Sequence, residues 1–350
     1  MTWLYLTCAN WLPTGQMPKL SASAGPQNHS ESARSRGILR RVPEVLVRAQ
    51  GLTKRFGSFT AVDGIDFELF RGEAFGFLGP NGAGKSSTMR MLGCVSPPTV
   101  GDLTILGGDP VRDGAAIRAR LGVVPQEDTL DNELTVRENL LVYGRYFGLP
   151  RKVINERTDR LLDFVQLTER AGDQVDPLSG GMKRRLTIAR SLINEPDILI
   201  LDEPTTGLDP QARHVVWDRL FTLKQRGVTL ILTTHYMDEA EQLCDRLVVM
   251  DHGKIAAEGT PRALIDRYST PEVIELRFAA GQQEVAAEKV KDLSPERMEV
   301  TADRLLIYAT DGDQFLARVH RAGIEPLTEL VRRSTLEDVF LYLTGRTLVD

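Results

Sequence analysis

The first residues that suggest a chemical role, by their type and by their spacing, are a glycine-rich turn followed by a lysine and a serine. The run Gly79-Pro-Asn-Gly-Ala-Gly-Lys-Ser fits the pattern Gly-x4-Gly-Lys-Ser, and it follows an apolar stretch, Ala74–Leu78, that is typical of a strand. Glycines let backbone N–H groups curl around phosphates, and the next helix start adds positive potential. Lys85 would reach the β- and γ-phosphates, and the Ser86 hydroxyl would ligate Mg²⁺. The pattern therefore predicts a phosphate cradle made of Gly79, Pro80, Asn81, Gly82, Ala83, Gly84, Lys85, Ser86 and Ser87.

Two adjacent carboxylates at the end of another apolar strand are the next candidates. Ile198–Leu201 is followed directly by Asp202 and Glu203. An acid at the end of a buried strand beside a phosphate loop can hold the Mg²⁺ shell, which suits Asp202. Glu203 is the next residue outward and is placed to act as general base for an attacking water. A solvated Asp-Glu-Pro turn is the alternative, and the phosphate loop in the same chain argues against it.

A second helix start that could bind an anion is Leu178-Ser-Gly-Gly-Met182. Ser179, Gly180 and Gly181 place a hydroxyl and open backbone N–H groups at the positive end of a helix. A chain with one complete phosphate loop has no evident internal use for another cradle. We therefore expect this one to serve a nucleotide bound to another subunit, and an ordinary serine-capped helix is the alternative that the residues leave open.

The elements that must position these residues predict an α/β fold, with the parallel sheet core of a P-loop NTPase. Short apolar strands alternate with helices on both sides of the phosphate loop, which favours a parallel sheet covered by helices. The expected strands are 45–47, 65–69, 74–78, 121–124, 198–201, 228–233 and 247–250, and the expected helices are 84–93, 211–225 and 237–243.

Residues 127–177 predict a helical subdomain inserted into this fold. The stretch Val136–Phe147 is amphipathic, and 151–167 predicts a second helix. Thr135 can cap the first helix, with Glu138 three residues later in the position of a capping box. No clear strand pattern interrupts these helices.

A change of pattern near residue 270 predicts a small α+β C-terminal domain. Elements in the order βαββαβ are expected at 273–278, 283–292, 297–301, 304–309, 312–321 and 326–332, which suggests a ferredoxin-like unit. A last helix is expected to start at Ser334, with Glu337 completing its capping box. We thus divide the chain into a disordered N-terminal tail at 1–43, a nucleotide-binding domain at 44–265 and an accessory domain at 270–350.

Composition narrows the classes of function. The 350 residues carry 43 basic and 48 acidic side chains, a formal net charge of −5, which argues against nucleic acid as a partner. The three cysteines are too few and too scattered for a disulfide framework or a zinc site. A membrane-spanning helix needs about 20 mostly apolar residues, and no such run is visible. If the protein works at a membrane, we expect another chain to supply the span.

Taken together, the motifs Gly79–Ser86, Leu178–Met182, Ile198–Glu203 and Gly207–Pro210, with His235, resemble the nucleotide-binding subunit of an ABC transporter. The resemblance covers about residues 45–260. It implies that Gln126 lies on the glutamine loop, which senses Mg²⁺ and the γ-phosphate and faces the membrane partner. It also implies that His235 is the switch histidine that touches the γ-phosphate.

Two further residues take their roles only from this resemblance. Asp209 matches the loop that couples the two sites of a dimer, and Phe56 matches the aromatic residue that stacks on adenine, where a tyrosine is usual. Met182 departs from the family pattern, which usually has glutamine there. Simple core packing is the alternative for Phe56.

The resemblance implies an ATP-hydrolysing enzyme with ATP and Mg²⁺ as cofactors, and with Ser86, Gln126 and Asp202 near the metal. Two copies would dimerise head to tail around two MgATP and power a separate transmembrane permease from the cytoplasmic face of the membrane. The stretch Leu178–Asp245 and the ending Ser334–Phe340 are similar to drug-resistance and nodulation-factor exporter ATPases. The alternatives are a soluble ABC-type ATPase acting on ribosomes or DNA, or an ATP-switched regulatory module.

Overall fold

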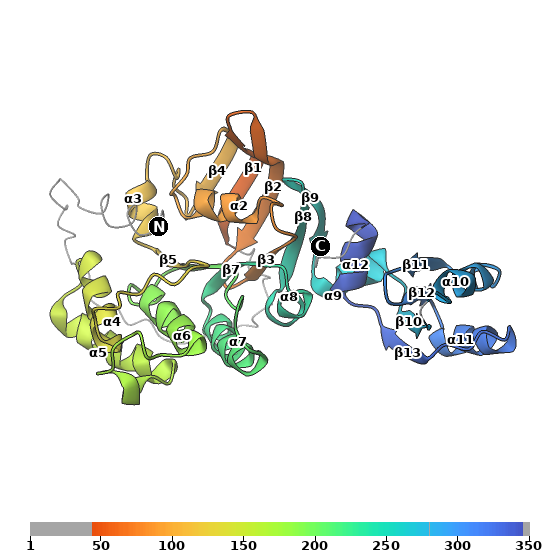
Figure 1. Ribbon diagram of the computed structural model, residues 1–350. Helices are drawn as coiled ribbons and strands as arrows, with labels where there is room; N and C mark the ends of the chain where they lie inside the picture. Colours follow the sequence, from red (N-terminus) through yellow and green to blue (C-terminus); the bar gives the residue numbers. More distant parts are fainter. Residues whose placement is uncertain (1–43, 280, 346–350) are drawn as a thin grey trace, which may run out of the picture.

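A six-stranded, mainly parallel sheet forms the centre of the computed structural model, which describes residues 44–279 and 281–345 (Figure 1). The predicted tail at 1–43 lies outside the described residues. Neighbouring strands run in the order β5-β6-β7-β3-β8-β9, and only the β8–β9 pair is antiparallel. The strands are β3 (Ala74–Leu78), β5 (Leu121–Val124), β6 (Ile198–Asp202), β7 (Thr229–Thr234), β8 (Arg246–Asp251) and β9 (Lys254–Gly259). Every residue of β3, β6 and β7 is buried, as expected for strands covered on both faces.

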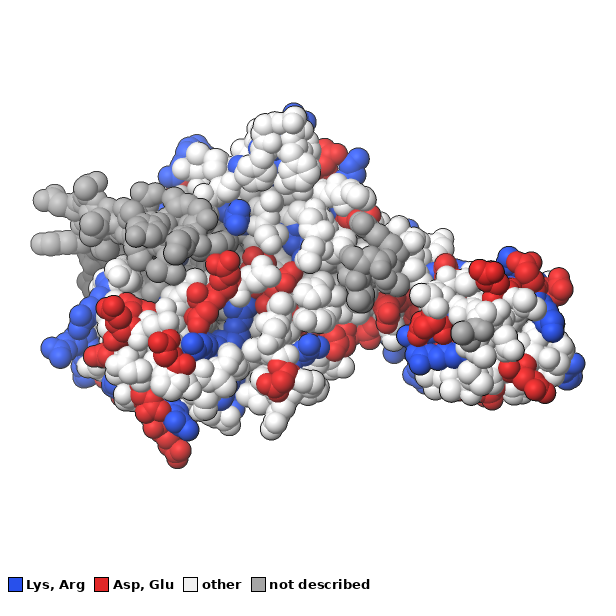
Figure 2. Space-filling model, in the orientation of Figure 1, with Lys and Arg blue, Asp and Glu red and all other residues white. Residues whose placement is uncertain are grey.

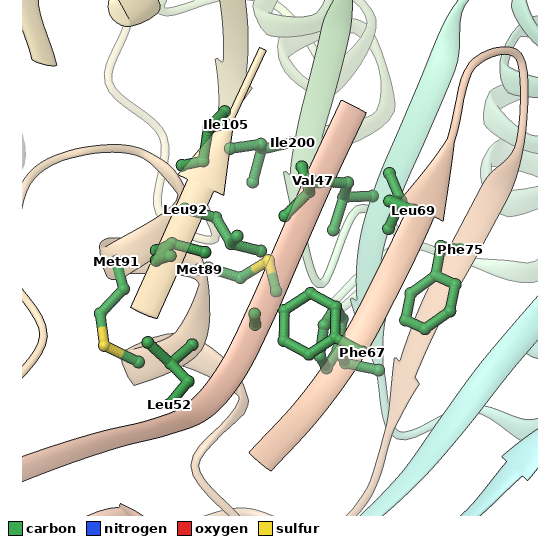
Figure 3. Close-up of a cluster of buried hydrophobic side chains, with 14 of the residues drawn as sticks. Val47, Leu52, Phe67, Leu69, Phe75, Met89, Met91, Leu92, Ile105 and Ile200 are labelled. Carbon is green, nitrogen blue, oxygen red and sulfur yellow. The ribbon is translucent and has the colours of Figure 1, made fainter. Parts of the chain in front are cut away.

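A second, antiparallel sheet packs over the first one. It has the order β2-β1-β4, from β1 (Val45–Phe56), β2 (Phe59–Phe70) and β4 (Val100–Ile105). Helix α2 (Lys85–Leu92) contributes Met89 to the core between the layers, where Phe67 and Phe75 stack with ring centroids 6.0 Å apart. Figure 3 shows these side chains in one cluster with Ile200 of the parallel sheet. The strands β1 and β2 are much longer than the predicted ranges 45–47 and 65–69. The prediction was too short because register shifts interrupt the alternation that marks a strand in the sequence.

The helical part of the chain lies at one end of the parallel sheet (Figure 1). Its helices are α4 (Val136–Tyr146), α5 (Arg151–Phe164) and α6 (Gly180–Ser191), with the short α3 (Gly114–Arg118) before β5 and a 3₁₀ turn, η1 (Thr168–Arg170). The expected capping box is present, since Thr135 accepts from the Glu138 backbone and the Glu138 carboxylate accepts from the Thr135 backbone. Val136, Leu140, Leu162 and Leu186 bury a core shared by these helices.

The C-terminal lobe has the predicted βαββαβ order. It comprises β10 (Glu272–Arg277), α10 (Gln283–Lys291), β11 (Arg297–Val300), β12 (Leu305–Ala309), α11 (Gly312–Arg321) and β13 (Thr328–Arg333). All pairs in its sheet, of order β11-β12-β10-β13, are antiparallel. With β10 as the first strand this is the order 4-1-3-2 when read from β13, in which the first and third strands lie at the centre.

The cap of the last helix was predicted one residue too early. Helix α12 (Leu336–Thr344) is capped by Thr335 with Asp338 in the reciprocal position, and not by Ser334 with Glu337. Ser334 is engaged elsewhere, because its hydroxyl donates to the Thr270 carbonyl and accepts from Ser269. Its side chain therefore ties the start of the lobe to its end.

Helix α12 returns from the lobe to the parallel-sheet body. Leu336, Val339 and Phe340 are fully buried in the same cluster as Leu243 of α8 (Met237–Leu243) and Leu264 of α9 (Pro261–Tyr268). Figure 1 shows α12 between the body and the projecting lobe. None of the helices in the described ranges is long and apolar enough to cross a membrane.

A groove of about 680 Å³ lies at the seam between body and lobe. Acidic side chains gather at this seam in Figure 2, and the groove is lined by Glu241, Asp266 and Glu272 together with two arginines. Two of these acids already accept backbone hydrogen bonds, Glu241 from Leu336 and Glu272 from Gly312. Glu241 therefore joins α8 of the body to the start of α12, whereas Glu272 holds α11 against its own lobe.

Candidate functional site

Four neighbouring parallel strands bring the candidate residues to one edge of the sheet. Gln126 follows β5, Glu203 follows β6, His235 follows β7 and the glycine-rich loop follows β3. Parallel strands end at a common edge, so residues far apart in the sequence meet there. This edge carries the chemistry that the sequence predicts.

Lys85 lies beneath the glycine-rich loop with a side chain only 4% exposed. Its Nζ donates to the carbonyl oxygens of Gly79 at 2.6 Å and Pro80 at 3.1 Å, and it lies 3.7 Å from Glu203 Oε1. Burial lowers the pKa of Lys85, and the nearby carboxylates of Glu203 and Asp202 oppose that effect. The cation is thus held within the loop by groups that favour its charge.

The loop has a shape that only glycines allow. A Cβ on Gly79 would lie 2.3 Å from the Met250 carbonyl oxygen, and one on Gly84 would lie 2.4 Å from that of Ala61. Gly84 also has a φ of +102°, which L side chains rarely adopt, and it precedes α2 without a capping side chain. The loop therefore fits a phosphate group, since an uncapped helix start and a buried lysine are suitable anion ligands.

Asp202 and Glu203 differ in their surroundings although they are neighbours. Asp202 is buried and accepts a hydrogen bond from Thr233 Oγ1 at 2.6 Å. Burial raises its pKa, and the hydrogen bond from Thr233 counteracts this. Glu203 has a φ of +47°, which turns its side chain away from the strand direction, and its backbone N–H donates to Thr233 Oγ1.

The Glu203 carboxylate is the meeting point of the site. Its Oε2 accepts from Gln126 Nε2 and from Thr206 Oγ1, each at 3.1 Å, and lies 3.4 Å from His235 Nδ1. The His235 imidazole lowers the pKa of Glu203, and burial opposes that shift. The carboxylate therefore favours its charged form, which is the form that accepts a proton.

Oxygen donors at this edge suit Mg²⁺. Asp202 supplies a carboxylate and Ser86 a hydroxyl, the hard ligands that Mg²⁺ prefers, while Mg²⁺ commonly keeps several waters and bonds to substrate phosphates. Within the described residues there is no cluster of three or more His, Cys, Asp or Glu that could hold a metal by itself. The donor set therefore fits a metal that arrives together with a phosphate ligand.

The remaining predicted residues are not joined to this group by hydrogen bonds within the described chain. Ser179 is exposed and accepts a hydrogen bond from the Met182 backbone N–H. It therefore caps α6, as in the alternative of a serine-capped helix. Gly181 has a local reason as well, because its Cβ would lie 2.8 Å from that of Ala212. Asp209 caps α7 (Pro210–Gln225) and, like Ser179, is exposed.

Phe56 is 49% exposed at the turn between β1 and β2, with Lys54 Nζ 5.2 Å from the centre of its ring. A ring exposed to this extent is available for stacking on a ligand. Its exposure argues against the alternative that Phe56 is a core residue.

Arg184 is a positioning residue that the sequence analysis missed. It is buried on α6 and donates to four backbone carbonyl oxygens, those of Pro125, Asp202, Glu203 and Pro204. One guanidinium therefore fixes the start of the Gln126 loop against the end of β6. A signal was present, since Arg184 lies four residues before the apolar Ile188 on a helix and so on its buried face.

Comparisons with known proteins agree with this geometry. A family model described as ABC transporter matches residues 62–206, and one described as the C-terminal domain of the nodulation factor export protein NodI matches residues 283–345. A Nod factor export ATP-binding protein I from Rhizobium sp. (strain N33) is 49% identical over 87% of this chain and 99% of its own length. Its counterpart in Sinorhizobium fredii is 46% identical over 92% of each chain.

Solved structures give the same result for the body of the molecule. An ATP-binding subunit of an ABC transporter matches with a TM-score of 0.58 and 29% identity, over 64% of this chain and 93% of that one. The cbiO1 protein from Clostridium perfringens, part of the ABC transporter complex cbiONQ, matches with a TM-score of 0.60 and 29% identity, over 63% and 91%. A dimeric ATP-binding cassette in a post-hydrolysis state, bound to ADP and phosphate, matches with a TM-score of 0.56 and 27% identity, over 61% and 98%.

Proposed function

Because this chain belongs to the family of ABC transporter ATP-binding proteins, we propose that it hydrolyses ATP to drive export through a separate transmembrane permease. Its relatives are named for the export of Nod factor, and their names favour export over a role on ribosomes or DNA. We place the protein at the cytoplasmic face of the membrane, bound to its permease. The residues that select the cargo would lie in that other subunit.

The observation that carries the proposal is the Glu203 carboxylate beside Lys85, Gln126 and His235. Lys85 would hold the β- and γ-phosphates, and Phe56 would stack on adenine. Glu203 would take a proton from the water that attacks the γ-phosphate, and Gln126 would orient that water. His235 would contact the γ-phosphate. Ser86, Asp202 and Gln126 would hold Mg²⁺, which neutralises phosphate charge when bound.

Two copies would close head to tail around two MgATP. The helix start at Ser179, Gly180 and Gly181 is exposed, and no hydrogen bond within the described residues joins it to the phosphate loop of its own chain. This supports contact with the nucleotide of the second copy. Asp209 would lie at the same interface. The γ-phosphate then links the subunits because both neutralise its charge, and its removal opens the dimer.

The first experiment replaces Glu203 with glutamine, which keeps the shape of the side chain but cannot accept the proton. General-base catalysis contributes about 10²- to 10⁴-fold, so we expect turnover to fall by that factor while ATP still binds. The E203Q chain is also expected to form an ATP-dependent dimer, measured by light scattering during size-exclusion chromatography. ATP hydrolysis at the parent rate would rule out Glu203 as the base.

The second experiment tests the split site. In the E203Q chain, Ser179→Arg should abolish the ATP-dependent dimer, because a long side chain blocks the helix start that meets the second nucleotide. Thr135→Ala is the matched control, since it removes the cap of α4 at about 1 kcal/mol but lies outside the proposed interface. Dimerisation that survives Ser179→Arg unchanged would contradict the head-to-tail arrangement.

A further inference from the structure

A buried carboxylate that the proposed chemistry does not use lies one helical turn after His235. Glu239 is on α8, and its side chain is 0% exposed. Acidic side chains are almost never fully buried unless they are paired. Its position therefore needs an explanation from its contacts.

The contacts of Glu239 join three elements. Its Oε1 accepts from Thr205 Oγ1 at 2.8 Å and from Trp217 Nε1 at 3.0 Å. Thr205 lies in the loop that connects Glu203 to Asp209, and Trp217 lies on α7, the helix that Asp209 caps. The carboxylate thus connects the helix after His235 to both ends of the segment that carries Asp209.

The groups around Glu239 belong to the elements of the nucleotide site. Burial raises the pKa of Glu239, and the hydroxyls of Thr234 and Thr205 and the Trp217 indole oppose this. Thr234 directly precedes His235. Burial lowers the pKa of Arg184, the residue that fixes the end of β6, and among the nearby carboxylates Glu239 opposes this shift most strongly. A second Glu239 oxygen, Oε2, is buried without a hydrogen-bond partner in the described residues.

Helix α7 also holds the residue between His235 and α8. The Arg213 guanidinium lies 4.2 Å from the centre of the Tyr236 ring, and that ring lies 4.1 Å from the His235 ring. Arg213 also approaches Asp238 at 3.7 Å. Two sets of contacts therefore connect α7 to the His235 turn, one made by Glu239 and the other by Arg213.

We propose that Glu239 is a positioning residue that makes the Asp209 loop and the His235 turn move as one unit. A second copy that contacts Asp209 would shift Thr205 and α7, and Glu239 would pass that shift to α8 and His235. Closure of the dimer would in this way set His235 and the nearby Glu203 for hydrolysis. The inference rests on the proposed function, because it requires an ATP-dependent dimer.

The test uses the full chain carrying E203Q, in which ATP is bound but not consumed. Glu239→Gln keeps the volume and one acceptor oxygen but removes the charge. We expect the ATP concentration for half-maximal dimerisation to rise about tenfold, the scale set by hydrogen bonds to charged groups. Glu241→Gln is the matched control on the same helix, because Glu241 faces α12 instead, and it should leave that concentration unchanged.

Thr205→Val provides a second variant if Glu239→Gln folds poorly, since it removes only one donor. If Glu239 acts through Thr205, the two substitutions together should weaken dimerisation no more than the stronger one alone. A merely structural role would instead lower the melting temperature and leave the ATP concentration for half-maximal dimerisation unchanged.

The possible outcomes separate the two proposals. If E203Q alone forms no dimer with ATP, the proposed function fails, and this inference fails with it. If E203Q dimerises and neither Glu239→Gln nor Thr205→Val changes the ATP requirement, only the inference about Glu239 is overturned.

Discussion

Replacing Arg184 with methionine should destabilise the nucleotide site while leaving its named residues intact. The guanidinium donates to four buried carbonyl oxygens, at 2.6 Å for Pro204, 3.0 Å for Asp202 and 2.9 Å for Glu203, with Pro125 as the fourth. Burial lowers its pKa to about 10, so it is charged at neutral pH. Methionine fills most of the space but satisfies none of these acceptors.

The size of the effect follows from those contacts. A hydrogen bond to a charged group contributes about 1.5–3 kcal/mol, but bonds that share one side chain are not additive. Removing one partner from a buried charged network costs about 3–5 kcal/mol, which we take as the expected loss for Arg184→Met. Domains of this kind have about 5–15 kcal/mol in total, so the variant should fold with little reserve.

The assay is urea unfolding, paired with ATP turnover well below the unfolding midpoint. Arg185→Met is the matched control, since the neighbouring arginine donates to a single carbonyl, that of Val165, and should cost about 1–3 kcal/mol. Turnover should fall for Arg184→Met even among folded molecules, because Gln126 and Glu203 lose their common support. An unfolding free energy within about 0.5 kcal/mol of the parent, with full turnover, would refute the reasoning.

Two further predictions concern the C-terminal lobe. Phe340→Ala removes a fully buried ring from the contact with α8 and α9 and should lower the free energy of unfolding by about 3–5 kcal/mol in thermal or urea melts, whereas Tyr342→Ala, at an exposed position of the same helix, should cost much less. Burial raises the pKa of Glu275, but hydrogen bonds from Arg332 and Arg304 outweigh this effect and leave the pKa lowered. The charged Glu275 therefore stabilises the fold above the ordinary carboxyl range, and this stabilisation is lost as the pH falls through the lowered pKa. Glu275→Gln should therefore lower stability at pH 7 but not at strongly acidic pH; an equal loss at both would show that the charge is unimportant.

The parts of the site that the sequence predicts are those with a local signal. Lys85 and Glu203 each stand in a short motif next to an apolar strand, so spacing alone indicates their chemistry. Gln126 and His235 follow strands without such a motif, and only the family resemblance singled them out. Their meeting at Glu203 depends on the strand order β5-β6-β7-β3, which no local pattern records.

The residues that were missed have partners far away in the sequence. Arg184 bonds to residues up to 59 positions distant, and Glu239 to one 34 positions distant. Each sits on a helix where a charged residue normally indicates a solvated face. The cap of α12 was misplaced for a different reason, because Ser334 and Thr335 are both good capping residues and the competing bond from Ser334 to Thr270 decides between them.

The return of α12 to the body has a consequence during synthesis of the protein. Leu336, Val339 and Phe340 complete a cluster whose other members were translated about a hundred residues or more earlier in several cases, such as Leu199 and Val216. Until α12 has left the ribosome, that apolar face is open to water and to other chains, which favours aggregation or recognition by chaperones. Synthesis through α12 is thus a condition for a finished body, and chains that stop before this helix would expose the apolar residues that it covers.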